Sequence, residues 1–235
     1  MKSVLCTIIF LHAYCWCFGQ AETKYIDRGI KKIDLSLYPE AIEQFTKAIE
    51  VNTKSDQAYY YRANAKRELQ DLTSAIDDYT KSIELNPINY KAYYNRGLTY
   101  SDLNQLDLAV KDYTQSLSID SNQISPYVNR GICRAMNEEW ESALQDYNIA
   151  LSMDPKHTIA LKQRAFVYMK TENPESAISD CNKVLRIQKN SGNAFLIRGF
   201  SKIMLGKNNS GCKDIERAIL LEEPNAQQIF DEVCR

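Results

Sequence analysis

The sequence repeats itself every 34 residues over most of its length, and this repetition restricts the possible folds more than any other feature. An arginine recurs at this period, the residue after it is always small, and another small residue stands thirteen positions after the arginine. Such a period predicts an array of similar structural units that stack on one another. The three series are Arg28, Arg62, Arg96, Arg130, Arg164 and Arg198; Gly29, Ala63, Gly97, Gly131, Ala165 and Gly199; and Ala41, Ala75, Ala109, Ala143, Ala177 and Gly211.

Each repeat is expected to form two helices. Within residues 90–123, apolar and small residues recur at helical spacing and predict helices over residues 92–103 and 108–119, with a short turn at Asn104 and Gln105. The proline after Asn86 and the proline after Asp154 are expected to end second helices, because proline cannot continue a helix. The recurring glycine or alanine leaves room where two helices cross, so a large neighbour such as Tyr113 can pack there.

This pattern resembles the tetratricopeptide repeat (TPR) family along nearly all of the chain after its N-terminal segment. The resemblance implies an all-α fold, an α-α superhelix built as a solenoid of antiparallel helix pairs, with a C-terminal capping helix at residues 226–235. The expected repeats are residues 22–55, 56–89, 90–123, 124–157, 158–191 and 192–225. The family's alternation of large and small residues is met in two repeats by Tyr59, Ala63, Leu72, Ala75, Tyr79, Ser82 and Pro87, and by Tyr127, Gly131, Trp140, Ala143, Tyr147, Ala150 and Pro155.

The recurring arginine departs from the family pattern, which usually has an apolar residue at this position. Sixteen residues after it, an aspartate recurs in five repeats, whereas the first repeat has Gln44. The two series predict ion pairs between helices, within or between repeats, since a planar guanidinium can bond a carboxylate at two points. The alternative is a polar stripe on the solvent side. The aspartates are Asp78, Asp112, Asp146, Asp180 and Asp214.

Residues 1–21 have the layout of a secretory signal peptide. Lys2 precedes an apolar run over residues 4–18, and the small residues Gly19 and Ala21 follow it. The run is somewhat short for a transmembrane helix, which needs about 20 apolar residues, although an uncleaved anchor is the alternative. We therefore expect an exported protein, periplasmic or secreted, without stable membrane insertion after signal cleavage.

The cysteines are interpreted for an exported protein, in which disulfides are permitted. Cys212 and Cys234 lie on the last repeat's second helix and near the end of the terminal helix, and packing of these helices would bring them together, so we predict a disulfide between them. The alternative is two buried thiols. Cys133 and Cys181 are expected to be small core residues. No cysteine pair has zinc-site spacing, and the only histidine after residue 21 is His157, so neither a metal nor a cofactor is expected.

The resemblance also implies where a partner would bind. In TPR proteins the first helices line a concave surface that commonly takes an extended peptide or a helix of a partner. Its N-terminal half here is rich in tyrosine and asparagine, whereas its C-terminal half is apolar and rich in methionine, a residue suited to adaptable contacts. For Ile132, Phe166 and Phe200 the alternative is that they fill gaps between adjacent first helices. The expected groove residues are Tyr60, Asn64, Tyr94, Asn95, Leu98, Asn129, Ile132, Met136, Phe166, Met169 and Phe200.

These features favour a non-catalytic interaction scaffold that binds a peptide or helical segment of a partner protein in the concave groove. The alternative is a structural subunit of an envelope or secretion complex that uses its convex face or its ends. The sequence has no phosphate-loop, zinc-protease or serine-hydrolase motif, so an enzyme is not expected. A net charge of −1 gives no reason to expect nucleic-acid binding, and self-association is left open. Ile26 and Ile30 occupy the positions at which some TPR proteins clamp a C-terminal carboxylate, so that clamp is not formed.

Overall fold

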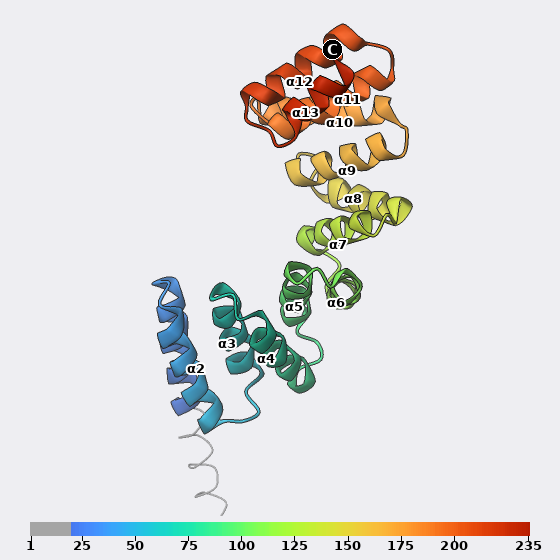
Figure 1. Ribbon diagram of the computed structural model, residues 1–235. Coiled ribbons are helices and arrows are strands. Elements are labelled where there is room, and N and C mark those ends of the chain that lie inside the picture. Colours follow the sequence, from blue (N-terminus) through green and yellow to red (C-terminus); the bar gives the residue numbers. More distant parts are fainter. Residues whose placement is uncertain (1–19) are drawn as a thin grey trace, which may run out of the picture. The chain divides into compact units, whose positions relative to one another are not determined.

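The computed structural model describes residues 20–235, and every regular element in that range is an α-helix (Figure 1). The all-α fold class expected from the sequence is therefore confirmed. The predicted signal peptide falls almost entirely on residues 1–19, which lie outside the described residues. Within residues 20–235, no helix combines the length and the apolar character that crossing a membrane requires.

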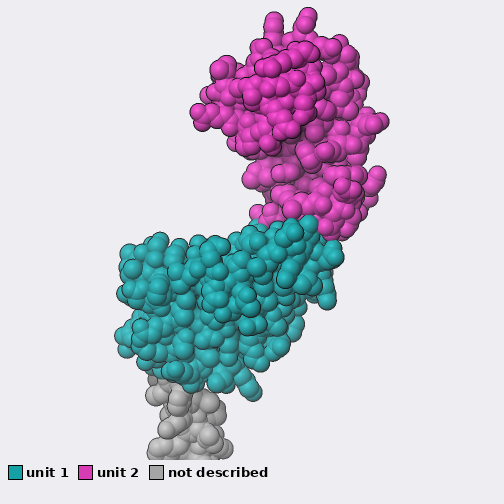
Figure 2. Space-filling model, in the orientation of Figure 1, with its two compact units in different colours: residues 1–121 teal, residues 122–235 magenta. Residues whose placement is uncertain are grey.

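The chain forms two compact units, residues 1–121 and residues 122–235 (Figure 2). The first unit contains a helix over residues 20–34, then α2 (Tyr38–Val51), α3 (Asp56–Glu68), α4 (Leu72–Leu85), α5 (Tyr90–Asp102) and α6 (Leu106–Ile119). The second unit contains α7 (Ile124–Met136), α8 (Trp140–Met153), α9 (Thr158–Lys170), α10 (Pro174–Ile187), α11 (Gly192–Met204), α12 (Asn208–Leu220) and α13 (Ala226–Val233). We refer to them as unit 1 and unit 2.

Within each unit, consecutive helices pack side by side. In unit 1, α3 packs on α4, α4 on α5 and α5 on α6; in unit 2, the same succession runs from α7 to α10, then through α11 and α12 to α13. The first helices of neighbouring pairs also contact one another, α3 with α5 in unit 1, and α7 with α9 and α9 with α11 in unit 2. This succession is that of a helical-repeat solenoid, and it places the first helices next to one another on one surface.

The helix ends follow from local capping. The Asn89 side chain accepts a hydrogen bond from the backbone N–H of Ala92 at 3.2 Å, so α5 begins at Tyr90, two residues before the predicted start. The helices α4 and α8 end at Leu85 and Met153, directly before Asn86 and Asp154, as predicted. Between the helices of each pair, one residue adopts a left-handed backbone conformation. Glycine, which favours this conformation, occupies the position only in the last repeat. These residues are Ser36, Gln70, Asn104, Glu138, Glu172 and Gly206.

The core between paired helices is built from the predicted small and large residues. A Cβ atom added to Gly131 would lie 2.6 Å from the Tyr147 ring, which is fully buried. A Cβ atom added to Gly97 would likewise lie 2.9 Å from the Tyr113 ring. The small residue on the first helix thus lets an aromatic side chain of the second helix lie against the backbone.

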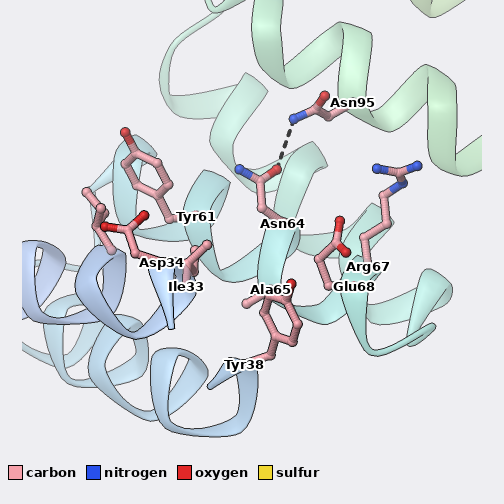
Figure 3. Close-up of a pocket in the computed structure, with 10 residues that line it drawn as sticks. Ile33, Asp34, Tyr38, Tyr61, Asn64, Ala65, Arg67, Glu68 and Asn95 are labelled. Atoms are coloured by element: carbon pink, nitrogen blue, oxygen red, sulfur yellow. Dashed lines mark hydrogen bonds between the residues drawn. The ribbon is translucent and has the colours of Figure 1, made fainter. Parts of the chain in front are cut away.

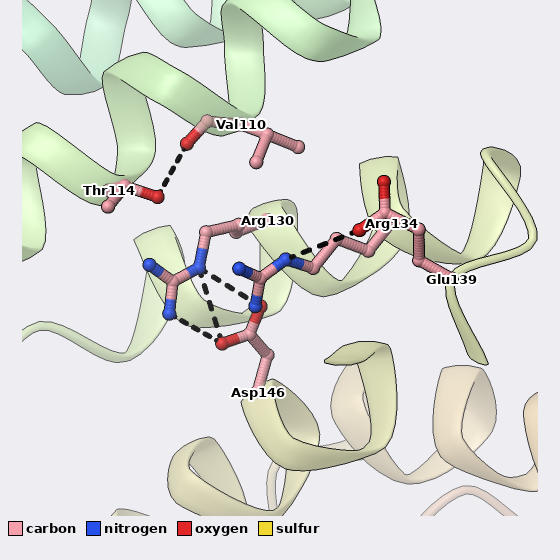
Figure 4. Close-up of polar contacts among 6 residues, drawn as sticks. All are labelled: Val110, Thr114, Arg130, Arg134, Glu139 and Asp146. Atoms are coloured by element: carbon pink, nitrogen blue, oxygen red, sulfur yellow. Dashed lines mark hydrogen bonds and ion pairs between the residues drawn. The ribbon is translucent and has the colours of Figure 1, made fainter. Parts of the chain in front are cut away.

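The recurring arginines and aspartates form ion pairs within the five repeats that carry both residues. In unit 2, Arg130 Nη2 lies 2.7 Å from Asp146 Oδ1, and Arg134 Nη1 lies 2.8 Å from Asp146 Oδ2 (Figure 4). The Asp146 side chain is 1% exposed, so the alternative of a solvent-side stripe is wrong. In unit 1, the Thr114 hydroxyl donates within its own helix, to the Val110 carbonyl oxygen at 2.7 Å (Figure 4). The other pairs are Arg62–Asp78, Arg96–Asp112, Arg164–Asp180 and Arg198–Asp214.

Several of these arginines also reach the preceding repeat, which the sequence analysis did not anticipate. Arg62 Nη1 donates to Thr46 Oγ1 at 3.1 Å, and Arg96 Nη1 donates to Thr80 Oγ1 at 2.9 Å. In unit 2, asparagines occupy the equivalent positions. Arg164 donates the corresponding hydrogen bond to Asn148, and Arg198 donates it to Asn182. Each of these guanidinium groups therefore ties three helices together, which fixes the register of one repeat on the next.

Candidate functional site

Unit 1 has a hollow of about 490 Å³ on the side of its first helices (Figure 3). The helix over residues 20–34, the start of α2, the second half of α3 and Asn95 of α5 contribute to its walls. The lining combines apolar, aromatic, amide and charged side chains. Its residues are Ile30, Ile33, Asp34, Tyr38, Tyr61, Asn64, Ala65, Arg67, Glu68 and Asn95.

Two of the predicted groove asparagines meet at this hollow. Asn95 Nδ2 donates to Asn64 Oδ1 at 2.9 Å and to the Tyr60 hydroxyl at 3.1 Å. The Tyr79 hydroxyl of α4 donates to the same Asn64 oxygen at 2.7 Å. The structure thus brings Tyr60, Asn64 and Asn95 together, and the network joins the first helices α3 and α5.

Three further predicted groove residues lie on the first helices α5 and α7. In α5, the Tyr94 ring packs against Tyr113 at a centroid distance of 5.8 Å, and Leu98 is half-buried. Asn129 is half-buried in α7 of unit 2. These three residues belong to first helices, as predicted, and they do not line the hollow of unit 1 shown in Figure 3.

Unit 2 has two further hollows along its first helices, and both are lined mainly by apolar side chains. One, of about 440 Å³, contains Phe166, Met169 and Phe200, and the other, of about 390 Å³, contains Ile132, Met136 and again Phe166. Lys170 borders both hollows, and its ammonium group lies 5.6 Å from the centre of the Phe166 ring. The apolar groove residues predicted for the C-terminal half therefore share one surface, on which Met136 is 57% exposed and Met204 is 40% exposed.

The terminal helix completes one of these hollows, and the sequence analysis missed this contribution. Ile229 of α13 lines the 440 Å³ hollow together with Phe200 and Met204. The predicted disulfide is formed between Cys212 of α12 and Cys234, which directly follows α13. No periodic signal could have identified Ile229, because α13 lies beyond the last complete repeat.

The surroundings of His157 and Cys181 give each of these side chains a structural role. His157 caps α9, since its Nδ1 accepts a hydrogen bond from the backbone N–H of Ala160 at 3.2 Å. Burial raises the pKa of the Cys181 thiol to about 12, so this thiol stays protonated and unreactive at neutral pH. Within residues 20–235, no group of three or more histidine, cysteine or acidic side chains is arranged to hold a metal ion.

Comparison with known proteins identifies the repeats. A family model described as "Tetratricopeptide repeat" matches residues 90–123, and one described as "TPR repeat" matches residues 63–104. No curated protein sequence matches the chain significantly.

Solved structures show the same fold at low sequence identity. The structure described as pilF of Pseudomonas aeruginosa is 13% identical with a TM-score of 0.77, over 92% of this chain and 98% of that chain. PilW, described as a type IV pilus biogenesis factor, is 17% identical with a TM-score of 0.73, over 90% of this chain and 99% of that one. YrrB, described as a TPR protein with an unusual peptide-binding site, is 22% identical with a TM-score of 0.67, over 75% and 95% of the two chains.

Proposed function

Because this chain is a tetratricopeptide repeat protein of about six repeats, we propose that it is a non-catalytic scaffold whose first helices bind a peptide or helical segment of a partner protein. The observation that carries this proposal is the apolar surface of unit 2. Ile132, Met136, Phe166, Met169 and Phe200 line two hollows on one side of α7, α9 and α11.

Exposure distinguishes this surface from an ordinary core. Met136 and Met204 are 57% and 40% exposed, although the burial of an apolar side chain lowers the free energy of the protein. Methionine side chains adapt to partners of different shape, because they are flexible and polarizable. A partner segment with two or three apolar side chains on one face would fill both hollows and cover these methionines.

The hollow of unit 1 suits the polypeptide backbone of the same kind of ligand. Asn64 uses its oxygen and Asn95 uses its amide nitrogen in the network with Tyr60 and Tyr79. This leaves the Asn64 nitrogen as a donor and the Asn95 oxygen as an acceptor, and a peptide bond offers the complementary carbonyl and N–H. Since Asn95 also holds α5 to α3, replacing it would disturb the packing of two repeats, and the apolar surface gives the cleaner test.

The expected compartment is the cell envelope or the outside of the cell, as the signal-like residues 1–21 indicate. The similarity to PilW, described as a pilus biogenesis factor, supports an envelope assignment at the level of the fold. The second candidate function, a structural subunit of an envelope or secretion complex, would use the second helices or the ends instead. Exposed apolar side chains on α8, Ile149 and Met153, give that alternative a specific surface.

Two matched double variants separate these functions. Met136→Glu with Met204→Glu places charges on the first-helix surface, and Ile149→Glu with Met153→Glu does the same at exposed apolar positions of α8. In a pull-down from the exported fraction of the native cells, we expect the first variant to bind its partner at least tenfold more weakly, because each glutamate removes an apolar contact of roughly 1 kcal/mol or more.

The α8 variant should bind like the unmodified protein, and circular dichroism should show the same helicity for all three proteins. Loss of the partner from the α8 variant, with full binding by the first variant, would contradict the proposal and favour the structural-subunit function.

A further inference from the structure

We propose that the Cys212–Cys234 disulfide is a redox control of the unit 2 binding surface: its formation holds α13 in place and completes the 440 Å³ hollow, and its reduction releases α13 and removes one wall. This inference rests on the proposed function of that surface. Three features of the structure carry it, namely the access to the disulfide, the weak attachment of α13 and the position of Ile229.

The disulfide is open to a soluble thiol. Cys212 and Cys234 are both half-buried and line a polar hollow of about 520 Å³ at the surface of unit 2. Lys213, Glu216 and Arg235 border the same hollow, so its cationic residues outnumber its acidic one, and positive charge nearby stabilises an incoming or departing thiolate. Disulfides that are accessible in this way are the ones that exchange with thiols, whereas Cys133 and Cys181 of the same unit are buried and form no disulfide.

The helix α13 has little else to hold it. It is eight residues long, and a helix of that length does not persist alone in water. It packs mainly against α12, and only Ala226 among its residues is fully buried. Its other side chains are half-buried or exposed, and two of its glutamines bond within the helix, to Asp231 and Glu232. The covalent link at its C-terminal end is therefore the main restraint on its position.

The position of α13 matters because Ile229 faces the binding surface. Ile229 lines the hollow with Phe200 and Met204 of α11 and with Phe166 and Met169 of α9. If α13 detaches, these side chains lose their neighbour and a bound segment loses the apolar contact that Ile229 supplies. The hollow is thus complete only after the disulfide has formed, which links binding to an oxidising compartment.

The chemical step is a thiol–disulfide exchange with a dithiol. One thiolate of the dithiol attacks a sulfur of the disulfide, forming a mixed disulfide and releasing the other cysteine as a thiolate. The second thiol of the dithiol then resolves the mixed disulfide. Cys212 and Cys234 end as two thiols, and the dithiol ends as a disulfide, so two electrons and two protons pass to the protein.

Hydrogen exchange measured by mass spectrometry tests the first part of the proposal on the whole chain. After reduction with dithiothreitol, the amides of α13 should exchange roughly a hundredfold faster than in the oxidised protein, because a disulfide of this loop length contributes a few kcal/mol to holding the segment. The double variant Cys212→Ser with Cys234→Ser should exchange fast with or without dithiothreitol. Equal protection of α13 in the oxidised and reduced proteins would overturn the proposal.

A diazirine analogue of leucine in place of Ile229 tests the position of the wall. In the oxidised protein, light should crosslink residue 229 to the peptide that contains Phe200 and Met204. Reduction should lower that crosslink at least tenfold. A crosslink of unchanged yield would show that α13 stays in place without the disulfide, and would also overturn the proposal.

Partner binding then distinguishes this inference from the proposed function. Reduction of the unmodified protein should weaken recovery of the partner about tenfold, the effect of removing one apolar contact, and Ile229→Ala should weaken it to a similar degree in the oxidised protein. If the partner binds the apolar surface equally well in both redox states, the redox control is wrong and the proposed function stands. If the partner binds neither state through that surface, the proposed function fails, while the exchange experiment still decides whether the disulfide holds α13.

Discussion

Replacing Asp146 by alanine is expected to lower the free energy of unfolding of unit 2 by about 3–5 kcal/mol. The Asp146 carboxylate is 1% exposed and accepts hydrogen bonds from Arg130 and Arg134, which are themselves only 12% and 21% exposed. Without the carboxylate, Arg130 loses this counter-charge and Arg134 keeps only its 4.0 Å contact with Glu139, so mostly buried positive charge is left with its main partner removed, and this is costly. Urea denaturation followed by far-UV circular dichroism measures the loss.

Two control variants show whether the buried charges are responsible. Gln145→Ala changes the exposed neighbouring residue on α8 and should alter the unfolding free energy by no more than about 0.5 kcal/mol. Asp112→Ala in unit 1 removes a carboxylate whose ion-pair partner is Arg96, and should cost less than Asp146→Ala. If Asp146→Ala destabilises the protein no more than Gln145→Ala does, the ion pairs do not hold the repeats together as described.

Unit 2 is expected to lose stability as the pH rises above about 9. Burial raises the pKa of Cys181 to about 12 and also raises the pKa of Tyr147 well above its ordinary value of 10.0. Above their ordinary values the unfolded chain loses these protons while the folded chain keeps them, so the unfolding free energy falls with rising pH. At about 1.4 kcal/mol per group and pH unit, the loss reaches roughly 4 kcal/mol between about pH 9 and pH 11.

Urea unfolding at several pH values measures this slope, and removal of the titrating groups identifies its source. Tyr147→Phe combined with Cys181→Ala should reduce the stability at neutral pH, because the cysteine side chain is fully buried. The unfolding free energy of the same double variant should nevertheless fall less steeply as the pH rises above about 9. A decline as steep as that of the unmodified protein would mean that other groups cause the alkaline instability.

Much of the fold follows from the periodicity, because each repeat obeys the same steric rule. The glycine or alanine after each arginine predicts the close approach of an aromatic residue, and Gly131 and Tyr147 show it. The pairing of Cys212 with Cys234 was also predictable, since it needs only that the terminal helix pack on the last repeat. These contacts join helices that are adjacent in the sequence, and the repeat pattern predicts how such helices pack.

Other features depend on a second partner that the sequence does not specify. The bond from Arg62 to Thr46 of the preceding repeat could have been found from the recurrence of threonine at Thr46, Thr80 and Thr114, but this series changes to asparagine at Asn148. The contacts of Asn95 with Asn64 and Tyr60 required knowledge of the spacing between α3 and α5. The role of Ile229 depends on the direction in which α13 leaves the last repeat, and no pattern in the sequence sets that direction.

Site-specific photo-crosslinking in the native cells tests most directly whether the first helices of unit 2 are the binding surface. A benzophenone amino acid is placed at Phe200, which lines the 440 Å³ hollow, and separately at Ile149 on α8. We predict that position 200 crosslinks to one contiguous segment of a partner protein, with apolar side chains on one face, and that position 149 gives no such product. Crosslinking of the partner from position 149, with none from position 200, would contradict the account.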